Sequence, residues 1–189
     1  AGLPALTVGV NLSAFQLQQS GFVAGVEHVL AETRLDGRYL NLELTESMVM
    51  GTTGAVVASL ERLRGLGVSL SMDDFGTGYS NLGHLTHLPL DILKIDRSFI
   101  RDVPGHHGAE SIARAIVSMG HSLGMRVVAE GVETVAQMEF LRSIWCEYAQ
   151  GYLFCKPLGA IACAAWMRER IANPAVSKPR PGRSIKRVA

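Results

Sequence analysis

The sequence predicts an α/β fold, specifically a TIM-like (β/α)8 barrel that is incomplete in this chain. Short apolar runs alternate with helical stretches, which is the pattern of parallel strands joined by helices. Polar side chains fall at the ends of the apolar runs, where a parallel barrel collects its functional groups. An open doubly wound sheet of six strands is the alternative fold, but no glycine-rich phosphate loop follows the first run.

Six apolar runs have the length and composition of strands. They are Val8–Leu12, Leu40–Leu44, Ser69–Met72, Ile92–Ile95, Arg126–Ala129 and Tyr148–Gln150. A complete barrel has eight strands and typically about 250 residues. The sequence therefore predicts about six of the eight βα units, and we expect the two missing units to precede Ala1.

Between these runs the apolar residues follow a helical period. Val56, Leu60 and Leu63 fall on one helical face, and Gly65–Gly67 stands where that helix should end. The last helix is predicted at about Ala160–Ile171, because Pro174 follows it. These elements predict one barrel domain over residues 1–172.

The composition is typical of a globular, soluble domain, with 48% hydrophobic and 19% charged residues among 189. No apolar run approaches the roughly 20 residues that a membrane span needs, and no leader peptide is recognisable. Cys146, Cys155 and Cys163 form no C-x-x-C pair, which favours a reducing compartment over a disulfide scaffold. We therefore expect a cytoplasmic domain, whose parent protein could still be anchored in a membrane.

Residues 173–189 differ from the rest of the chain in composition. From Ser177 to the end there are five basic residues and no acidic one, interspersed with proline. This composition predicts a basic, disordered tail. No aromatic residues interleave with the basic ones, so a nucleic-acid polymer is not expected as a partner.

Each predicted strand carries an amide, a carboxylate or a lysine near its carboxyl end. These residues are Asn11, Glu43, Asp73, Asp74, Lys94, Glu130 and Gln150. In a parallel barrel the carboxyl ends of all strands open on one face, so these residues would converge there.

Each residue taken alone has a structural alternative. The Asp73–Asp74 pair could form a turn or a helix cap, Glu43 could face solvent, and Lys94 could extend its ammonium to the surface. Asn11 could cap the following helix. The coincidence of all these residues with strand ends favours a shared site over separate structural roles.

This set of side chains suits hard divalent cations. Carboxylate and amide oxygens without His or Cys favour Mg²⁺ or Mn²⁺ over zinc. Two such ions, about 3.5–4 Å apart, could activate water and neutralise the charge of a phosphodiester. Lys94 would place a positive charge beside the phosphate or the nucleophile, and Glu130 could accept a proton from the attacking water.

Six segments together resemble the EAL domain of cyclic-di-GMP phosphodiesterases. They are Asn11-Leu12-Ser13, Glu43-Leu44-Thr45-Glu46-Ser47, Asp73-Asp74-Phe75-Gly76-Thr77-Gly78-Tyr79-Ser80, Leu93-Lys94-Ile95-Asp96-Arg97-Ser98-Phe99, Ala129-Glu130-Gly131-Val132-Glu133-Thr134 and Gln150-Gly151-Tyr152-Leu153-Phe154. They occur in unbroken order from about Val8 to Leu158, and the third and fourth are very specific.

The resemblance implies a domain that cleaves cyclic-di-GMP to linear pGpG with two Mg²⁺ or Mn²⁺ ions. It implies the following roles: metal ligation by Asn11, Glu43, Asp73 and Asp74; catalysis by Glu130, Lys94 and Asp74; substrate binding by Ser13, Gln150, Phe154 and Pro157; and anchoring of the Asp74–Ser80 loop by Glu46. It also implies a homodimer through that loop, and upstream sensory or cyclase-like (GGDEF) domains in a parent chain.

One departure from the family's pattern affects the metal site. The Glu-Ala-Leu motif, whose glutamate is the family's first metal ligand, is absent from this sequence. We expect its absence and that of the two βα units to have one cause, an N-terminal truncation that leaves an open barrel edge.

Two other functions compete with hydrolysis. The domain could be a catalytically silent cyclic-di-GMP receptor or signalling scaffold, which the missing glutamate would favour if its loss were native. The acidic strand ends could also be solvated loop residues without a chemical role. The second reading predicts that Mg²⁺ or Mn²⁺ leaves thermal stability unchanged.

Overall fold

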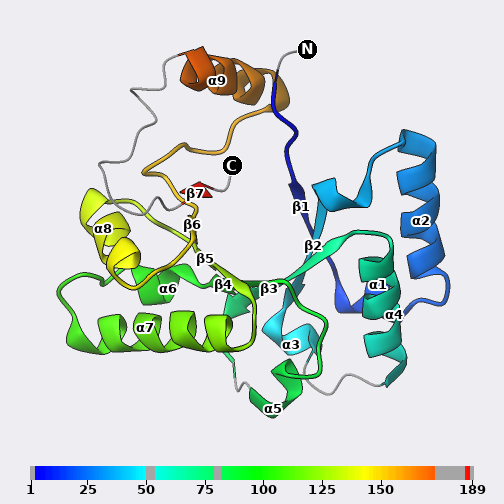
Figure 1. Cartoon of the computed structure of the whole chain (residues 1–189), viewed down its shortest axis with the longest axis horizontal. Coiled ribbons are helices and arrows are strands. Elements are labelled where there is room, and N and C mark those ends of the chain that lie inside the picture. Colours follow the sequence, from blue (N-terminus) through cyan, green and yellow to red (C-terminus); the bar gives the residue numbers. More distant parts are fainter. Residues whose placement is uncertain (1–2, 50–53, 79–81, 173–185, 188–189) are drawn as a thin grey trace.

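The computed structural model describes residues 3–49, 54–78, 82–172 and 186–187. Its strands form one parallel sheet in the order of the sequence. They are β1 (Val8–Asn11), β2 (Leu40–Thr45), β3 (Ser69–Phe75), β4 (Ile92–Ile95), β5 (Arg126–Ala129), β6 (Tyr148–Ala149) and β7 (Lys186–Arg187). Figure 1 shows the sheet bending into part of a barrel, which confirms the predicted incomplete α/β barrel and not the open doubly wound sheet.

Helices connect the strands on the outer side of the bend (Figure 1). They are α1 (Ala14–Gln18), α2 (Phe22–Thr33), α3 (Glu46–Val49), α4 (Gly54–Gly65), α5 (Leu82–Leu85), α6 (Arg97–Ile100), α7 (His107–Ser122), α8 (Val135–Ser143) and α9 (Ala160–Ala172), with a 3-10 turn, η1 (Gly37–Tyr39). Helix α9 lies apart from the others, across the open side of the bend and near the N-terminal segment.

The two faces of the sheet differ because successive side chains of a strand point to opposite sides. Leu93 and Val127 face α7, where the absence of a side chain at Gly120 allows close contact with both. Both are fully buried, and burying a side chain of this size contributes roughly 1.5–3 kcal/mol. Their neighbour Lys94 therefore points to the concave side, together with the polar residues of β2 and β3.

Glycines cap the ends of two helices, and the first of them lies in the predicted Gly65–Gly67 segment. Gly67 after α4 and Gly124 after α7 both have positive φ, at 85° and 73°. The NH of Met125 bonds back to the carbonyl of Gly120, which closes the last turn of α7. Each cap ends a helix shortly before the next strand, β3 after α4 and β5 after α7.

The end of the chain is described only in part. Lys186–Arg187 pair with Tyr148–Ala149 as β7, and residues 173–185 and 188–189 lie outside the described residues. The division at residue 172 and the disordered tail therefore stay predictions. Among the described helices, none combines the length and the apolarity that a membrane crossing requires.

Candidate active site

A lysine surrounded by three carboxylates occupies the carboxyl-terminal edge of the sheet. Lys94 Nζ lies 2.7 Å from Glu43 Oε2, 2.7 Å from Glu130 Oε1 and 2.9 Å from Asp73 Oδ1. The lysine is only 6% exposed. We call Lys94, Glu43, Asp73, Asp74 and Glu130 the carboxylate cluster. The structure thus brings together five of the residues predicted from the sequence.

The parallel register explains how four strands supply these groups. Asn11 is level with Glu43 across β1 and β2, and the NH of Glu130, just past β5, bonds to the carbonyl of Ile95 at the end of β4. Because parallel strands end on the same edge, residues far apart in sequence meet there. Lys94 spans the space between β2 and β5, since its long side chain reaches carboxylates from both.

A β-bulge in β3 places two aspartates at this edge. Met72 pairs with Leu93 and Phe75 with Ile95, so Asp73 and Asp74 together lie opposite Lys94 alone. Asp74 has a φ of 54°, which is uncommon for a residue other than glycine, and its NH donates to Asp73 Oδ1 at 3.1 Å. The sequence prediction ended this strand at Met72, but the pairing of Phe75 extends β3 through the two aspartates.

The shared environment shifts the pKa of three members of the cluster. Burial, reinforced by Asp73 and Glu43, raises the pKa of Glu130 despite the nearby lysine. Burial also raises the pKa of Asp74, and Asp73 and Asp96 add to this effect. Burial opposes the charge of Lys94, but its hydrogen bonds with Glu130 and Glu43 outweigh burial and raise the pKa of its ammonium. The ammonium is therefore a permanent cation at neutral pH.

Three carboxylates of the cluster are close enough to share a metal ion. Asp73, Asp74 and Glu130 each offer an oxygen atom, and these oxygens lie within 4.8 Å of one another. Carboxylate oxygens without imidazole or thiolate suit a hard divalent cation. The cluster holds one ammonium and four carboxylates, which leaves a formal excess of three negative charges that a cation would reduce.

Sequence reasoning missed a buried polar network beneath the cluster. Asn41 Nδ2 donates to Glu43 Oε1 at 3.2 Å and to Ser71 Oγ at 2.9 Å, and Ser69 Oγ donates to Asn41 Oδ1 at 3.2 Å. Asn41 and Ser71 are 7% and 0% exposed. The sequence did carry a signal: these residues lie two or four positions before Glu43 and Asp73 on the same strands. Because alternate residues of a strand point to the same side, they share the concave face with the cluster.

The residues predicted on the first strand and its following helix lie nearer to solvent. Asn11 ends β1 as an exposed residue beside Glu43. Ser13 caps α1: its hydroxyl accepts from the NH of Gln16, and its own NH donates to Gln16 Oε1. A substrate-binding role for Ser13 stays a prediction, since its side chain bonds to Gln16 within the helix cap.

Glu46 connects the start of α3 to the loop after β3. The residue is 4% exposed, and its Oε2 accepts from the NH of Gly76 at 3.0 Å and of Gly78 at 3.4 Å. A side chain at Gly78 would collide with Glu46 Oε1, so glycine allows the close approach. Tyr79 and Ser80, the end of the predicted loop, lie outside the described residues, and the functional role of Glu46 stays a prediction.

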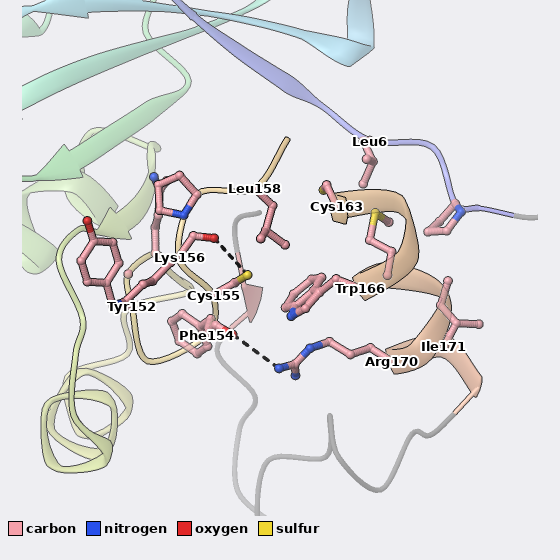
Figure 2. A pocket seen from close by; sticks show the side chains of 15 residues that line it. Leu6, Tyr152, Phe154, Cys155, Lys156, Leu158, Cys163, Trp166, Arg170 and Ile171 are labelled. Atoms are coloured by element: carbon pink, nitrogen blue, oxygen red, sulfur yellow. Dashed lines mark hydrogen bonds between the residues drawn. The ribbon is translucent and has the colours of Figure 1, made fainter. Parts of the chain in front are cut away.

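Gln150, Phe154 and Pro157 line a different part of the molecule, a hollow of about 740 Å³ between the β6–α9 connection and α9. Figure 2 shows Phe154 and Trp166 beside Arg170, whose Nη2 donates to the carbonyl of Phe154 at 3.4 Å. Of the described residues that line the hollow, none belongs to the carboxylate cluster. Substrate binding by these residues stays a prediction.

Comparison with known proteins places this geometry in a family. The model of the EAL domain matches residues 2–157, which is most of the chain. The chain belongs to the EAL domain family. The match includes every residue of the carboxylate cluster and the lining residues of the hollow up to Pro157.

Named relatives of the EAL domain agree with this assignment. The chain is 49% identical over 168 residues to the cyclic di-GMP phosphodiesterase NbdA of Pseudomonas aeruginosa, covering 89% of this chain and 22% of NbdA. The curated relatives that match are much longer, and the chain spans about a fifth of their length.

Solved EAL structures share the fold. The PaMucR phosphodiesterase in complex with c-di-GMP superposes with a TM-score of 0.78 at 43% identity, covering 83% of this chain and 64% of PaMucR. A manganese and cy-diGMP complex of Klebsiella pneumoniae BlrP1 has a TM-score of 0.74 at 32% identity, covering 80% of this chain and 39% of BlrP1. Together with the carboxylates in this chain, that complex indicates divalent metal use in the family.

Proposed function

We propose that this EAL domain, in its full-length protein, hydrolyses cyclic-di-GMP to linear pGpG with Mg²⁺ or Mn²⁺. The observation that carries the proposal is the carboxylate cluster, in which three carboxylates surround one buried lysine and a fourth, Asp74, lies close to two of them. The NbdA and PaMucR names support the substrate, because each refers to cyclic-di-GMP. The BlrP1 complex supports manganese for the metal, and the oxygen donors of this chain suit magnesium equally.

The residues of the site would have two kinds of role: some would bind the cations, and others would transfer protons or stabilise charge. Asn11, Glu43, Asp73 and Asp74 would hold the cations, since all four lie near the carboxyl ends of adjacent parallel strands. Bound divalent cations would lower the pKa of a water molecule and neutralise charge on the phosphodiester. Of these four, Asp73 and Glu43 already hold oxygens within hydrogen-bond distance of Lys94.

Glu130 and Lys94 would act on the attacking water and the phosphate. The raised pKa of Glu130 brings this carboxylate nearer to the range in which it can accept and return a proton. Lys94 keeps its positive charge and holds Glu130 Oε1 at 2.7 Å, which orients the base. The ammonium would also stabilise negative charge that develops on the phosphate during in-line attack.

Substrate binding is assigned to groups outside the carboxylate cluster. Ser13 and Gln150 would contact the dinucleotide, while Phe154 and Pro157 would receive a guanine base. Glu46 would anchor the loop after β3, through which the domain would form a homodimer. A cytoplasmic location and additional sensory or cyclase-like domains in the parent chain also belong to this proposal.

The test is product analysis with the full-length protein. Cyclic-di-GMP is incubated with Mg²⁺ or Mn²⁺ and the products are separated by chromatography, with Glu43→Ala and Arg64→Ala variants in parallel. We expect metal-dependent pGpG from the wild type and from Arg64→Ala, whose side chain lies at the opposite edge of the sheet. Glu43→Ala should form none. Cyclic-di-GMP that is retained but never cut would reject hydrolysis in favour of a receptor.

A further inference from the structure

The side-chain amide of Asn41 is buried, and its hydrogen bonds join residues on the concave face of the sheet. It lies on β2 two residues before Glu43 and is level with Ser69 on β3. Its Nδ2 donates one hydrogen to Glu43 Oε1 and the other to Ser71 Oγ, while its Oδ1 accepts from Ser69. The amide is therefore fully bonded, and one of its bonds ends on a residue of the carboxylate cluster.

We propose that Asn41 is a positioning residue that fixes the carboxylate of Glu43 for metal binding. This inference rests on the proposed function, because it takes Glu43 as a metal ligand. Glu43 is held at both oxygens: Asn41 bonds Oε1 at 3.2 Å and Lys94 bonds Oε2 at 2.7 Å. A carboxylate held at both oxygens keeps one orientation. Cation binding therefore requires less additional ordering of this side chain.

The surrounding groups leave the amide only one orientation. A carboxylate accepts hydrogen bonds and cannot donate them, so the nitrogen of Asn41 and not its oxygen must face Glu43. Ser69 is compatible with this arrangement on the other side, because its hydroxyl donates to Asn41 Oδ1. Ser71 is fully buried, which prevents water from replacing its bond to Asn41.

The strand on the other side of Glu43 also keeps the carboxylate in place. Gly9 of β1 is level with Asn41, and a Cβ atom at Gly9 would collide with Glu43 Oε1. The carboxylate thus lies over a glycine that provides space and against an amide that provides a hydrogen bond. Space alone would permit several orientations, whereas the charge-assisted bond from Asn41 selects one.

The first test measures metal affinity in the full-length protein. Calorimetric titration with Mn²⁺, without nucleotide, compares the wild type with Asn41→Asp and Asn41→Leu. Asn41→Asp keeps the volume but sets an acceptor against Glu43, and Asn41→Leu removes the donor. We expect Mn²⁺ affinity to fall about 10–100-fold in both, as when a group that orients a metal ligand is lost.

Val117→Ala is the control for a general loss of stability. Val117 is a buried residue of α7 on the outer side of the sheet, so its truncation should lower the unfolding temperature and leave Mn²⁺ affinity within twofold of wild type. Wild-type affinity in Asn41→Asp or Asn41→Leu would overturn the proposal. So would an equal loss of affinity in Val117→Ala.

A second test needs neither metal nor activity. Thermal unfolding in chelator is measured for the wild type, Asn41→Asp, Glu43→Gln and the double variant. Asn41→Asp should lower the midpoint clearly in the wild-type background and much less beside Glu43→Gln, since a neutral amide removes the repulsion between two carboxylates. Equal losses in both backgrounds would overturn the positioning role, while hydrolysis by the wild type would still stand.

Discussion

Both edges of the sheet carry carboxylates, but the two edges differ in how many basic groups are paired with them. At the amino-terminal edge, Asp91 bonds Arg64 at 3.0 Å and accepts from the NH of Leu70. Glu147 likewise contacts His121 at 2.8 Å and accepts from the NH of Val127. Each of these two carboxylates has one basic partner and one backbone donor.

The carboxyl-terminal edge has no such balance. Three carboxylates share the buried ammonium of Lys94, and a fourth, Asp74, lies beside Asp73 and Glu130. Excess charge of one sign destabilises a folded protein, whereas a bound cation would relieve it. The comparison teaches that the two amino-terminal carboxylates are each paired with one basic group, whereas the carboxylate cluster is not, and this excess of negative charge marks the edge where we propose that a cation binds.

The largest expected effect comes from removing the ammonium that contacts three carboxylates of the carboxylate cluster. Lys94→Met leaves Glu43, Asp73 and Glu130 facing one another without compensation. We expect the metal-free protein to lose about 3–5 kcal/mol of unfolding free energy, as when a buried ion pair loses one partner. Urea unfolding in chelator measures the loss, and Mn²⁺ should restore part of it. An unchanged unfolding free energy would show that the edge is not strained by its charge.

A smaller effect is expected from filling the space beside Glu43. Gly9→Ala places a methyl group against Glu43 Oε1, so the carboxylate must turn away. We expect Mn²⁺ affinity to fall about 10–100-fold, because the ligand loses its orientation. Calorimetric titration checks this, with Gly25→Ala as the control, since an added Cβ there meets nothing within 4 Å. Equal affinity in the two variants would contradict the packing around Glu43.

The pH dependence of stability provides a more moderate test of the same edge. The pKa of Glu130 is raised on folding, so this group favours the native state below its ordinary pKa of 4.5 and loses that contribution as pH rises through the native pKa. In chelator, the wild type should therefore lose stability relative to Glu130→Gln as pH rises from about 4.5. Unfolding midpoints across pH 4–8 measure this difference, and a constant difference would argue against the raised pKa.

The smallest effect is expected at the balanced edge. Arg64 is about half exposed, so its pair with Asp91 should contribute roughly 0.2–1 kcal/mol. Arg64→Ala should lower the unfolding free energy by that amount and leave hydrolysis of cyclic-di-GMP unchanged. A substantial loss of hydrolysis in this variant, at unchanged stability, would contradict the proposal that only the carboxyl-terminal edge takes part in hydrolysis.

The sequence predicted the strands well where hydrophobic runs mark them. Ile92–Ile95 and Arg126–Ala129 have the predicted bounds, because both are short apolar runs at the centre of the sheet. Strand β3 was predicted three residues too short, since a pair of aspartates resembles a turn when the bulge is unknown.

The cluster itself was predictable, but its internal bonds were not. The phase of the polar residues with the strand ends predicted that Glu43, Asp73, Lys94 and Glu130 would meet. That Lys94 would bond three carboxylates at once depends on its length and burial, which only the structure shows. Asn41 escaped notice because strand register decides which face an amide takes.

The most direct test of the account neutralises one carboxylate at each edge. Asp73→Asn and Asp91→Asn are the same chemical change, made in the full-length protein and titrated calorimetrically with Mn²⁺. Asp73→Asn should bind Mn²⁺ at least about tenfold more weakly than the wild type, because it removes a ligand. Asp91→Asn should bind as the wild type does while unfolding at a lower temperature. Equal Mn²⁺ affinity in both variants would contradict the claim that the crowded edge is a metal site.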